Sequence, residues 1–166
     1  SETHARADRS VGNFRVSCPA RFLAPRPLKA IAGTANRFVA AADPHDSAGI
    51  LDRFFPDARF FTEIERFDRF LEKRRRGPVE DRIDFVSIGS PNYLHDAHLR
   101  MALRAGAHAI CEKPLVVNPW NLDALEGIER ETGRKIHTVL QLRLHPALIA
   151  LRQELAGHRS STPAEV

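Results

Sequence analysis

The chain has 166 residues, of which 43% are apolar and 28% are charged, and this composition is typical of one globular domain. No apolar run approaches the roughly 20 residues that a bilayer-spanning helix needs, so we expect no membrane partner. The polar stretch 1–10 lacks the apolar core of a signal peptide, and two distant cysteines do not form a disulfide framework, which together favour a cytoplasmic location.

The net charge of +4 has one local source, the basic run at residues 73–76, which is followed by Gly77-Pro78. A basic patch can bind nucleic acid. The same run also suits a solvated helix end, where cations complement the negative end of the helix dipole. Because no aromatic residues or binding motif accompany the charges, we favour the helix end and expect no nucleic-acid partner.

Short segments rich in β-branched and apolar residues alternate with longer segments of helical periodicity. In chain order, strands and helices are predicted alternately at 14–17, 27–36, 37–42, 47–55, 59–61, 64–76, 85–88, 93–105, 107–111, 118–132, 135–140 and 146–155. This alternation indicates an α/β fold with a doubly wound, Rossmann-like parallel sheet. We expect one domain at 13–156, a disordered extension at 1–12 and a loop-like tail at 157–166.

Polar residues follow several of the predicted strands, where the carboxyl ends of a parallel sheet form a ligand crevice. Asp43 follows the strand 37–42, and its carboxylate suits the two hydroxyls of an adenosine ribose. An Asp-Pro turn without a ligand explains the same residues equally well. The sequence leaves these two interpretations open.

The strand 85–88 is followed by Gly-Ser-Pro-Asn-Tyr-Leu-His. Ser90 is predicted to cap the next helix by accepting from its free N–H groups. Asn92 and His95 are expected to point from the first helical turn towards the crevice. Helix capping alone, with His95 on the surface, is the simpler alternative.

Two further segments place polar side chains beyond a predicted strand. Glu112 and Lys113 stand side by side after the strand 107–111, and a proline follows them. Lysine at this point can hydrogen-bond a substrate hydroxyl, and it can act as a base if its pKa is depressed, whereas a surface ion pair is the structural alternative. Gln141 and Arg143 follow the last strand, and the planar guanidinium of Arg143 suits a carboxylate or phosphate. No Cys or His pair has metal-ligand spacing, so we predict no metal site.

Taken together and in this order, these segments resemble the Gfo/Idh/MocA oxidoreductases, for which Glu-Lys-Pro after a strand is the most recognisable motif. The runs at 42–50, 90–95, 110–115, 128–132 and 140–143 resemble one branch of the family, the UDP-N-acetyl-2-amino-2-deoxyglucuronate dehydrogenases. The resemblance covers about residues 13–155.

The resemblance implies NAD as cofactor and a UDP-sugar as substrate. The sugar would be UDP-N-acetylglucosaminuronic acid, oxidised at C3 to the 3-keto sugar on a route to bacterial surface polysaccharide, as in lipopolysaccharide biosynthesis. Lys113 would be the catalytic residue. The cofactor would contact residues from every loop named above: Asp43, Ser90, Asn92, His95, Glu112, Lys113, Gln141 and Arg143.

The sequence departs from the family pattern in two ways. Family members carry a Gly-Ala-Ala-Gly turn after the first strand, whereas this chain has Cys18-Pro19-Ala20-Arg21. Glycine lets backbone N–H groups approach the pyrophosphate, so we expect weakened NAD binding. The family's C-terminal α+β substrate domain is also missing, so we expect the chain by itself to be inactive. A sheet face left uncovered would favour a homo-oligomer.

These departures keep two other functions open. The chain could be a non-catalytic nucleotide-binding or interaction module with a degenerate phosphate loop. It could also belong to another Gfo/Idh/MocA dehydrogenase that acts on a different sugar or polyol.

Overall fold

The computed structural model describes residues 15–19, 25–34, 36–45, 47–140 and 145–159. Strands and helices alternate along the chain, with a 3-10 turn before β4 and another before α4. The elements are β1 (Arg15–Pro19), α1 (Pro25–Ala32), β2 (Arg37–Ala42), α2 (Ala48–Phe54), β3 (Arg59–Phe61), α3 (Ile64–Arg76), η1 (Val79–Asp81), β4 (Phe85–Ile88), η2 (Asn92–Leu94), α4 (His95–Arg104), β5 (His108–Cys111), α5 (Asn121–Thr132), β6 (Ile136–Thr138) and α6 (Pro146–Arg159).

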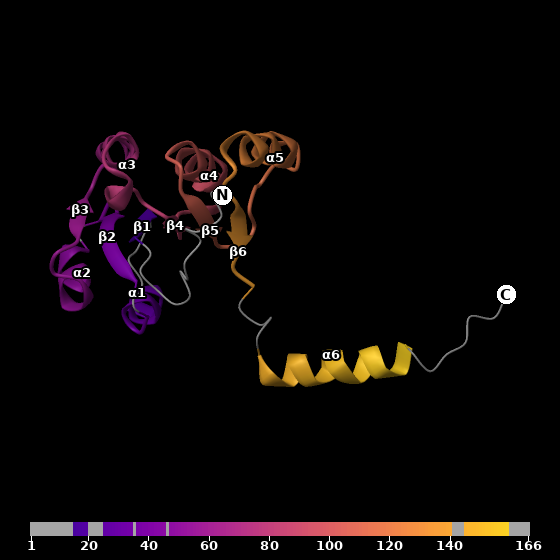
Figure 1. The fold of residues 1–166 in the computed structure, drawn as a ribbon. Coiled ribbons are helices and arrows are strands. Elements are labelled where there is room, and N and C mark those ends of the chain that lie inside the picture. The colour runs from indigo at the N-terminus through magenta and orange to yellow at the C-terminus, as the bar shows by residue number, and fades with distance from the viewer. Residues whose placement is uncertain (1–14, 20–24, 35, 46, 141–144, 160–166) are drawn as a thin grey trace, which may run out of the picture.

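The six strands form one sheet in the order β3-β2-β1-β4-β5-β6, and every neighbouring pair is parallel. This order is that of a doubly wound dinucleotide-binding fold, which confirms the predicted fold class. Figure 1 shows α1 and α2 on one side of the sheet and α3, α4 and α5 on the other. The first strand, predicted at 14–17 and observed as β1, lies at the centre of the sheet, between β2 and β4.

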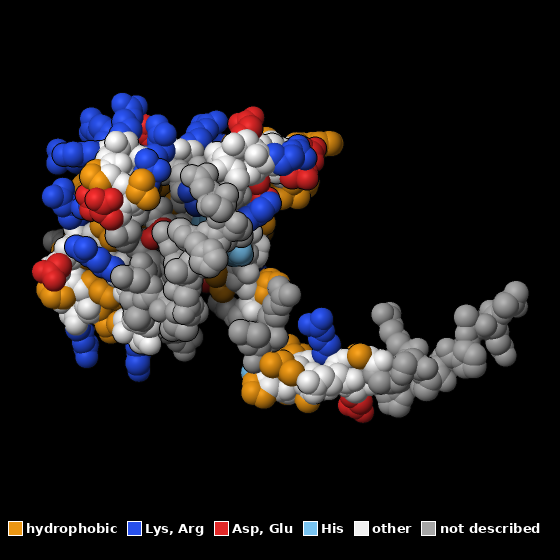
Figure 2. Space-filling model, viewed as in Figure 1, with side chains coloured by type: hydrophobic (Ala, Val, Ile, Leu, Met, Phe, Trp, Pro, Cys, Tyr) orange, Lys and Arg blue, Asp and Glu red, His pale blue; other side chains and the backbone are white. Residues whose placement is uncertain are grey.

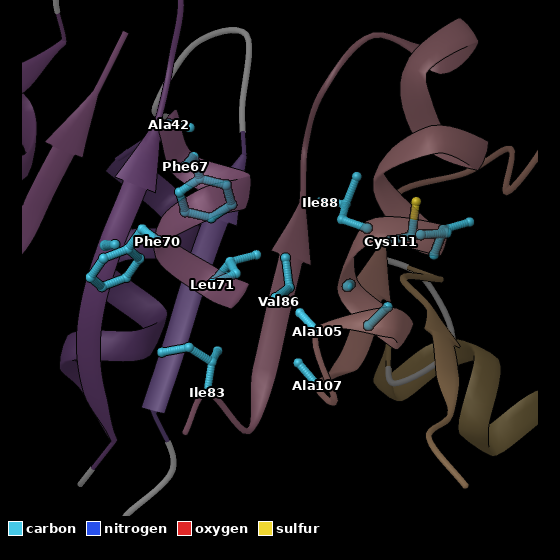
Figure 3. Packing of buried hydrophobic residues seen from close by; sticks show 14 of the residues in the cluster. Ala42, Phe67, Phe70, Leu71, Ile83, Val86, Ile88, Ala105, Ala107 and Cys111 are labelled. Atoms are coloured by element: carbon cyan, nitrogen blue, oxygen red, sulfur yellow. The ribbon is translucent and has the colours of Figure 1, made fainter. Parts of the chain in front are cut away.

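The core lies on both faces of the sheet. The larger cluster packs α3, α4 and α5 against the sheet, and Figure 3 shows Phe67, Leu71, Val86 and Ile88 within it. A smaller cluster joins α1 and α2 to the opposite face through side chains such as Leu28 and Leu51. Burying one such side chain contributes about 1.5–3 kcal/mol relative to leaving it exposed. The apolar faces of the helices therefore fix where each strand-to-helix loop emerges.

The basic run at residues 73–76 forms the last turn of α3, as predicted, and Gly77 follows as the C-cap. Its charges are partly neutralised in place: Arg75 and Arg76 pair with Glu72, and Arg74 pairs with Asp81. Figure 2 shows Lys and Arg side chains gathered over this helix. Paired cations at a helix end agree with the structural interpretation of the run.

Several predicted boundaries are wrong. The helix expected at 93–105 begins with the 3-10 turn η2, so α4 starts only at His95. The helix expected from residue 118 starts at Asn121, because the Asn118 side chain instead accepts the Trp120 N–H at 3.2 Å and forms a turn. The first helix, expected at 27–36, spans Pro25–Ala32. The last helix continues to Arg159, so the tail expected from residue 157 is helical at its start.

A glycine follows each of two helices. Gly106 and Gly133 follow α4 and α5 with φ angles of 79° and 66°. Residues with a Cβ adopt this left-handed conformation only with strain, so both turns favour glycine. Helix α6 differs from the others, because all of its described side chains through residue 156 are exposed and it lies apart from the sheet in Figure 1.

Candidate cofactor and substrate site

The candidate site lies at the edge of the sheet where the parallel strands end. Asp43 follows β2, Thr62 follows β3, Gly89 and Ser90 follow β4, and Glu112 follows β5. Because all neighbouring pairs are parallel, these segments emerge at one edge. The loops that carry Asp43, Asn92 and Lys113 therefore leave the sheet at this same edge, and the meeting of their side chains stays a prediction. Gln141 and Arg143 lie outside the described residues.

A cavity of about 500 Å³ opens at this edge between the ends of β2, β3 and β4 and the start of α3. This volume falls within the range of small-molecule binding sites. Its wall combines apolar side chains with three carboxylates, two imidazoles and three residues that carry hydroxyl groups. The lining residues are Ala42, Asp43, Pro44, His45, Thr62, Glu63, Ile64, Glu65, Ser90, Pro91, Tyr93, Leu94 and His98.

Asp43 is fully buried in the wall of this cavity. One carboxylate oxygen accepts the backbone N–H of His45 at 2.9 Å, and the other accepts the Ser47 hydroxyl at 2.8 Å. The carboxylate therefore holds the turn after β2 in shape, as the turn interpretation expected. It also lies in the cavity that the ribose interpretation requires, and each carboxylate oxygen can accept more than one hydrogen bond.

Ser90 does not cap a helix, so this prediction is wrong. The chain enters η2 through Pro91, whose carbonyl accepts the Leu94 N–H at 2.8 Å, and no side chain caps either η2 or α4. The Ser90 hydroxyl instead lies 2.8 Å from Nδ1 of His98. Burial, followed by the electrostatic effect of the neighbouring His95, lowers the pKa of His98 to about 4, so the His98 ring is neutral at pH 7.

His95 does not reach the rim, and it is not a surface residue either, so both expectations for its position are wrong. Its ring is 1% exposed. Nδ1 lies 2.6 Å from the carbonyl oxygen of Pro114, and Nε2 lies 2.8 Å from the carbonyl oxygen of Ser90. Both ring nitrogens are thus engaged by the backbone, which leaves neither for a bound ligand. Asn92 in the same segment is exposed.

Lys113 is exposed at the end of β5, and the peptide bond between Lys113 and Pro114 is cis. Glu112 is half-buried, and its N–H donates to the Ile88 carbonyl at 3.2 Å, which extends the ladder between β4 and β5 by one bond. In the part of the chain that the structure describes, no ion pair joins Glu112 to Lys113. The structural alternative, a surface ion pair between Glu112 and Lys113, is therefore not observed among the described residues.

Cys111 ends β5 and is fully buried. Burial, followed by the charge of Glu112, raises the pKa of its thiol to about 12. The thiol is protonated at neutral pH, and a protonated thiol is a poor nucleophile. Cys111 is therefore a packing residue.

Sequence reasoning missed part of the cavity wall. Residues 62–65 follow β3 and line the cavity, although no function was assigned to them. The rule that was applied to the other strand ends would have identified them. His98 was also missed, although it lies three residues after His95 and thus on the same face of a helix. Ser47 lies four residues after Asp43, but only the folded turn shows that the two bond.

Within the described residues, no group of three or more His, Cys, Asp or Glu side chains is placed to hold a metal ion. Among the same residues, none of the helices is both long enough and apolar enough to cross a bilayer.

A family model described as "Oxidoreductase family, NAD-binding Rossmann fold" (GFO_IDH_MocA) matches residues 29–139. The chain belongs to this family. The match confirms the resemblance read from the Glu-Lys-Pro segment and identifies the sheet as the family's NAD-binding domain. The cavity at the ends of β2, β3 and β4 lies at the edge of the sheet where dinucleotide-binding folds generally hold their ligand.

Two solved structures of one dehydrogenase are similar to most of this chain. The WlbA (WbpB) dehydrogenase from Thermus thermophilus, in complex with NAD and UDP-GlcNAcA, is 46% identical to this chain. It superimposes with a TM-score of 0.81 over 87% of this chain and 47% of its own length. The same dehydrogenase in complex with NAD and α-ketoglutarate gives a TM-score of 0.80.

Curated relatives are similar over shorter stretches. A UDP-N-acetylglucosamine 3-dehydrogenase from Acidithiobacillus ferrooxidans is 39% identical over 75 residues, which cover 43% of this chain and 23% of the relative. A D-glucoside 3-dehydrogenase from Escherichia coli is 38% identical over 72 residues, which cover 43% of this chain and 19% of the relative. The chain thus spans about a fifth to a half of the proteins it matches.

Proposed function

We propose that this chain is the NAD-binding part of a dehydrogenase that oxidises the C3 hydroxyl of UDP-N-acetylglucosaminuronic acid. The product would be the 3-keto sugar, an intermediate for bacterial surface polysaccharide, and the enzyme would act in the cytoplasm. The observation that carries the proposal is the 46% identity, over 87% of this chain, to a dehydrogenase crystallised with NAD and UDP-GlcNAcA.

The cavity fits the adenosine end of NAD. It adjoins the loop after β2, where dinucleotide folds place the adenosine ribose, and its volume is about 500 Å³. Asp43, Glu63 and Glu65 contribute three carboxylates to its wall. Negative charge at this point favours ribose hydroxyls and repels the additional phosphate of NADP. When bound, NAD supplies the acceptor for the hydride that leaves the sugar.

Lys113 is the proposed catalytic residue. Its side chain is exposed beyond β5, where it is free to reach a sugar placed over the crevice. In the proposed reaction Lys113 hydrogen-bonds the C3 hydroxyl, and in its neutral amine form it takes the hydroxyl proton as the hydride departs to NAD. Asn92, Glu112, Gln141 and Arg143 are proposed to contact the nicotinamide half of the cofactor and its boundary with the substrate.

A chimera tests the proposal directly. Residues 13–156 of this chain replace the matching half of the Thermus thermophilus WlbA dehydrogenase, which supplies a second domain. The turn at residues 18–21 is changed to Gly-Ala-Ala-Gly in the chimera to remove the weakened phosphate contact. We expect NADH formation with UDP-GlcNAcA and a 3-keto product identified by mass spectrometry. A folded chimera that binds NAD but does not oxidise this sugar would contradict the proposed substrate.

Within the chimera, Lys113→Ala should lower kcat by about 10²- to 10⁴-fold, the usual contribution of a general base. Its Kd for NAD should change far less. Lys73→Ala removes another exposed lysine, near the far end of α3, and serves as the matched control. Equal losses of NAD affinity and turnover in Lys113→Ala would contradict the catalytic role.

Two observations favour other functions. The Cys-Pro-Ala-Arg segment at 18–21, whose first two residues end β1, favours a module that binds nucleotides weakly or not at all. The side chains of this segment lie outside the described part of the chain. The similarity to a D-glucoside 3-dehydrogenase favours a different sugar. The chimera separates these cases. If the chain is a non-catalytic module, the chimera should show no turnover even with the restored turn. If the chain belongs to a dehydrogenase with a different specificity, the chimera should turn over another 3-hydroxy sugar.

A further inference from the structure

The buried ring of His95 bridges the two loops that follow β4 and β5. Its two nitrogens lie 2.6 Å and 2.8 Å from the carbonyl oxygens of Pro114 and Ser90. Pro114 is 19 residues away along the chain and directly follows Lys113. The ring therefore joins the cavity side of the crevice to the segment that carries the proposed catalytic lysine.

Both partners of this ring are backbone carbonyl oxygens, which can only accept hydrogen bonds. A neutral imidazole has one N–H donor and one nitrogen lone pair, so it can satisfy only one carbonyl. The other contact would set two lone pairs against each other within hydrogen-bond distance. Both nitrogens can donate a hydrogen bond to their carbonyl oxygens only if both carry a proton.

The surroundings of the ring are compatible with a buried cation. Two charge-assisted hydrogen bonds offset part of the cost of removing the charge from water. The neighbouring titratable groups on α4 add no net positive charge next to His95, since Asp96 pairs with Arg100 at 3.0 Å and His98 is neutral. Beyond β5, Glu112 is half-buried and adds a negative charge to the loop that His95 contacts.

We propose that His95 is a positioning residue: a buried imidazolium that fixes the backbone on the C-terminal side of Lys113. The N-terminal side is fixed by the hydrogen bond from the Glu112 N–H to the Ile88 carbonyl at 3.2 Å. The backbone of Lys113 is thus held from both directions, while its side chain stays exposed. The effect on catalysis rests on the function proposed above, whereas the charge and the bridge do not.

Nitrogen NMR on this chain, without cofactor or substrate, tests the charge. With selectively ¹⁵N-labelled histidine at about pH 7.5, both ring nitrogens of His95 should resonate in the protonated range and both ring protons should be observed. His98 serves as the internal control, with one protonated and one unprotonated nitrogen. The loss of one resonance pair in His95→Gln assigns the signals. A single protonated nitrogen on His95 would overturn the proposal.

Amide hydrogen exchange tests the bridge. Glutamine can place its amide near Nε2 and keep the Ser90 contact, but it cannot also reach Pro114. In His95→Gln the Glu112 amide should exchange about tenfold faster, as expected for the loss of a hydrogen bond to a charged group. His98→Asn is the matched control, since His98 bonds only the Ser90 side chain among the described residues. Equal Glu112 exchange in the wild type and in His95→Gln would overturn the bridge.

The two proposals can fail separately. If His95→Gln does not fold, the wild-type NMR spectrum still decides whether the ring is doubly protonated. In the chimera, a bridging His95 predicts that His95→Gln lowers kcat more than it weakens NAD binding. An active chimera with a neutral His95 would refute only the imidazolium, whereas an inactive chimera with a doubly protonated His95 would refute only the substrate assignment.

Discussion

The buried His98 gives the domain a specific dependence of stability on pH. The pKa of His98 falls from 6.5 to about 4 on folding, and the side chain is 7% exposed. The unfolded chain therefore binds a proton that the folded chain rejects, so stability rises with pH between these two values. The contribution is complete above about pH 6.5 and is lost as the pH falls towards 4. At about 1.4 kcal/mol per pKa unit, the loss amounts to roughly 3 kcal/mol.

The variant His98→Asn isolates this effect. Asparagine places an amide close to the position of Nδ1 and can still bond the Ser90 hydroxyl, but it does not titrate. Urea unfolding of both proteins from about pH 4 to about pH 7.5 gives the difference in the free energy of unfolding. We expect the wild type to lose stability relative to His98→Asn as the pH falls. Parallel curves for the two proteins would refute the reasoning, because other groups would then cause all of the pH dependence.

Three further predictions address the core, the cavity and the phosphate turn. Leu99→Ala should lower the free energy of unfolding by about 2–5 kcal/mol, because this side chain is 0% exposed, whereas Tyr93→Ala at 74% exposure should change it by less than about 0.5 kcal/mol in the same urea titration. Asp43→Asn should reduce the preference for NAD over NADP, measured as the ratio of Kd values by calorimetry in a protein with a restored glycine turn, and an unchanged ratio would contradict the role of its charge. Changing residues 18–21 to Gly-Ala-Ala-Gly should tighten NAD binding, and micromolar affinity of the unchanged chain would show that Pro19 and Arg21 do not impair the site.

The elements that the sequence predicts well are those decided by local chemistry. The strands at 37–42, 59–61 and 85–88 and helix α3 match their predicted bounds. Apolar content and the Gly77-Pro78 stop are enough to define them. A strand is predicted at 135–140, whereas the observed β6 spans only Ile136–Thr138. It is shorter because its length is set by pairing with β5 and not by its apolar content.

The site was less predictable where its geometry depends on distant backbone. His95 is polar and begins a helix, so local rules place it in solvent. Its burial depends on the Pro114 carbonyl, which comes from another strand end. Ser90 was likewise expected to cap a helix, but the 3-10 turn η2 lies between it and α4. The position of Asp43 was predictable from strand order, whereas its two intramolecular hydrogen bonds were not.

The two outer strands of the sheet, β3 and β6, have three residues each. A foreign strand that paired with either one would gain few backbone hydrogen bonds, and Arg59 adds a charge to the first of them. Short, charged borders of this kind protect a parallel sheet from uncontrolled growth into aggregates. Contacts between copies of this domain are therefore expected to involve helix side chains, and not an extension of the sheet.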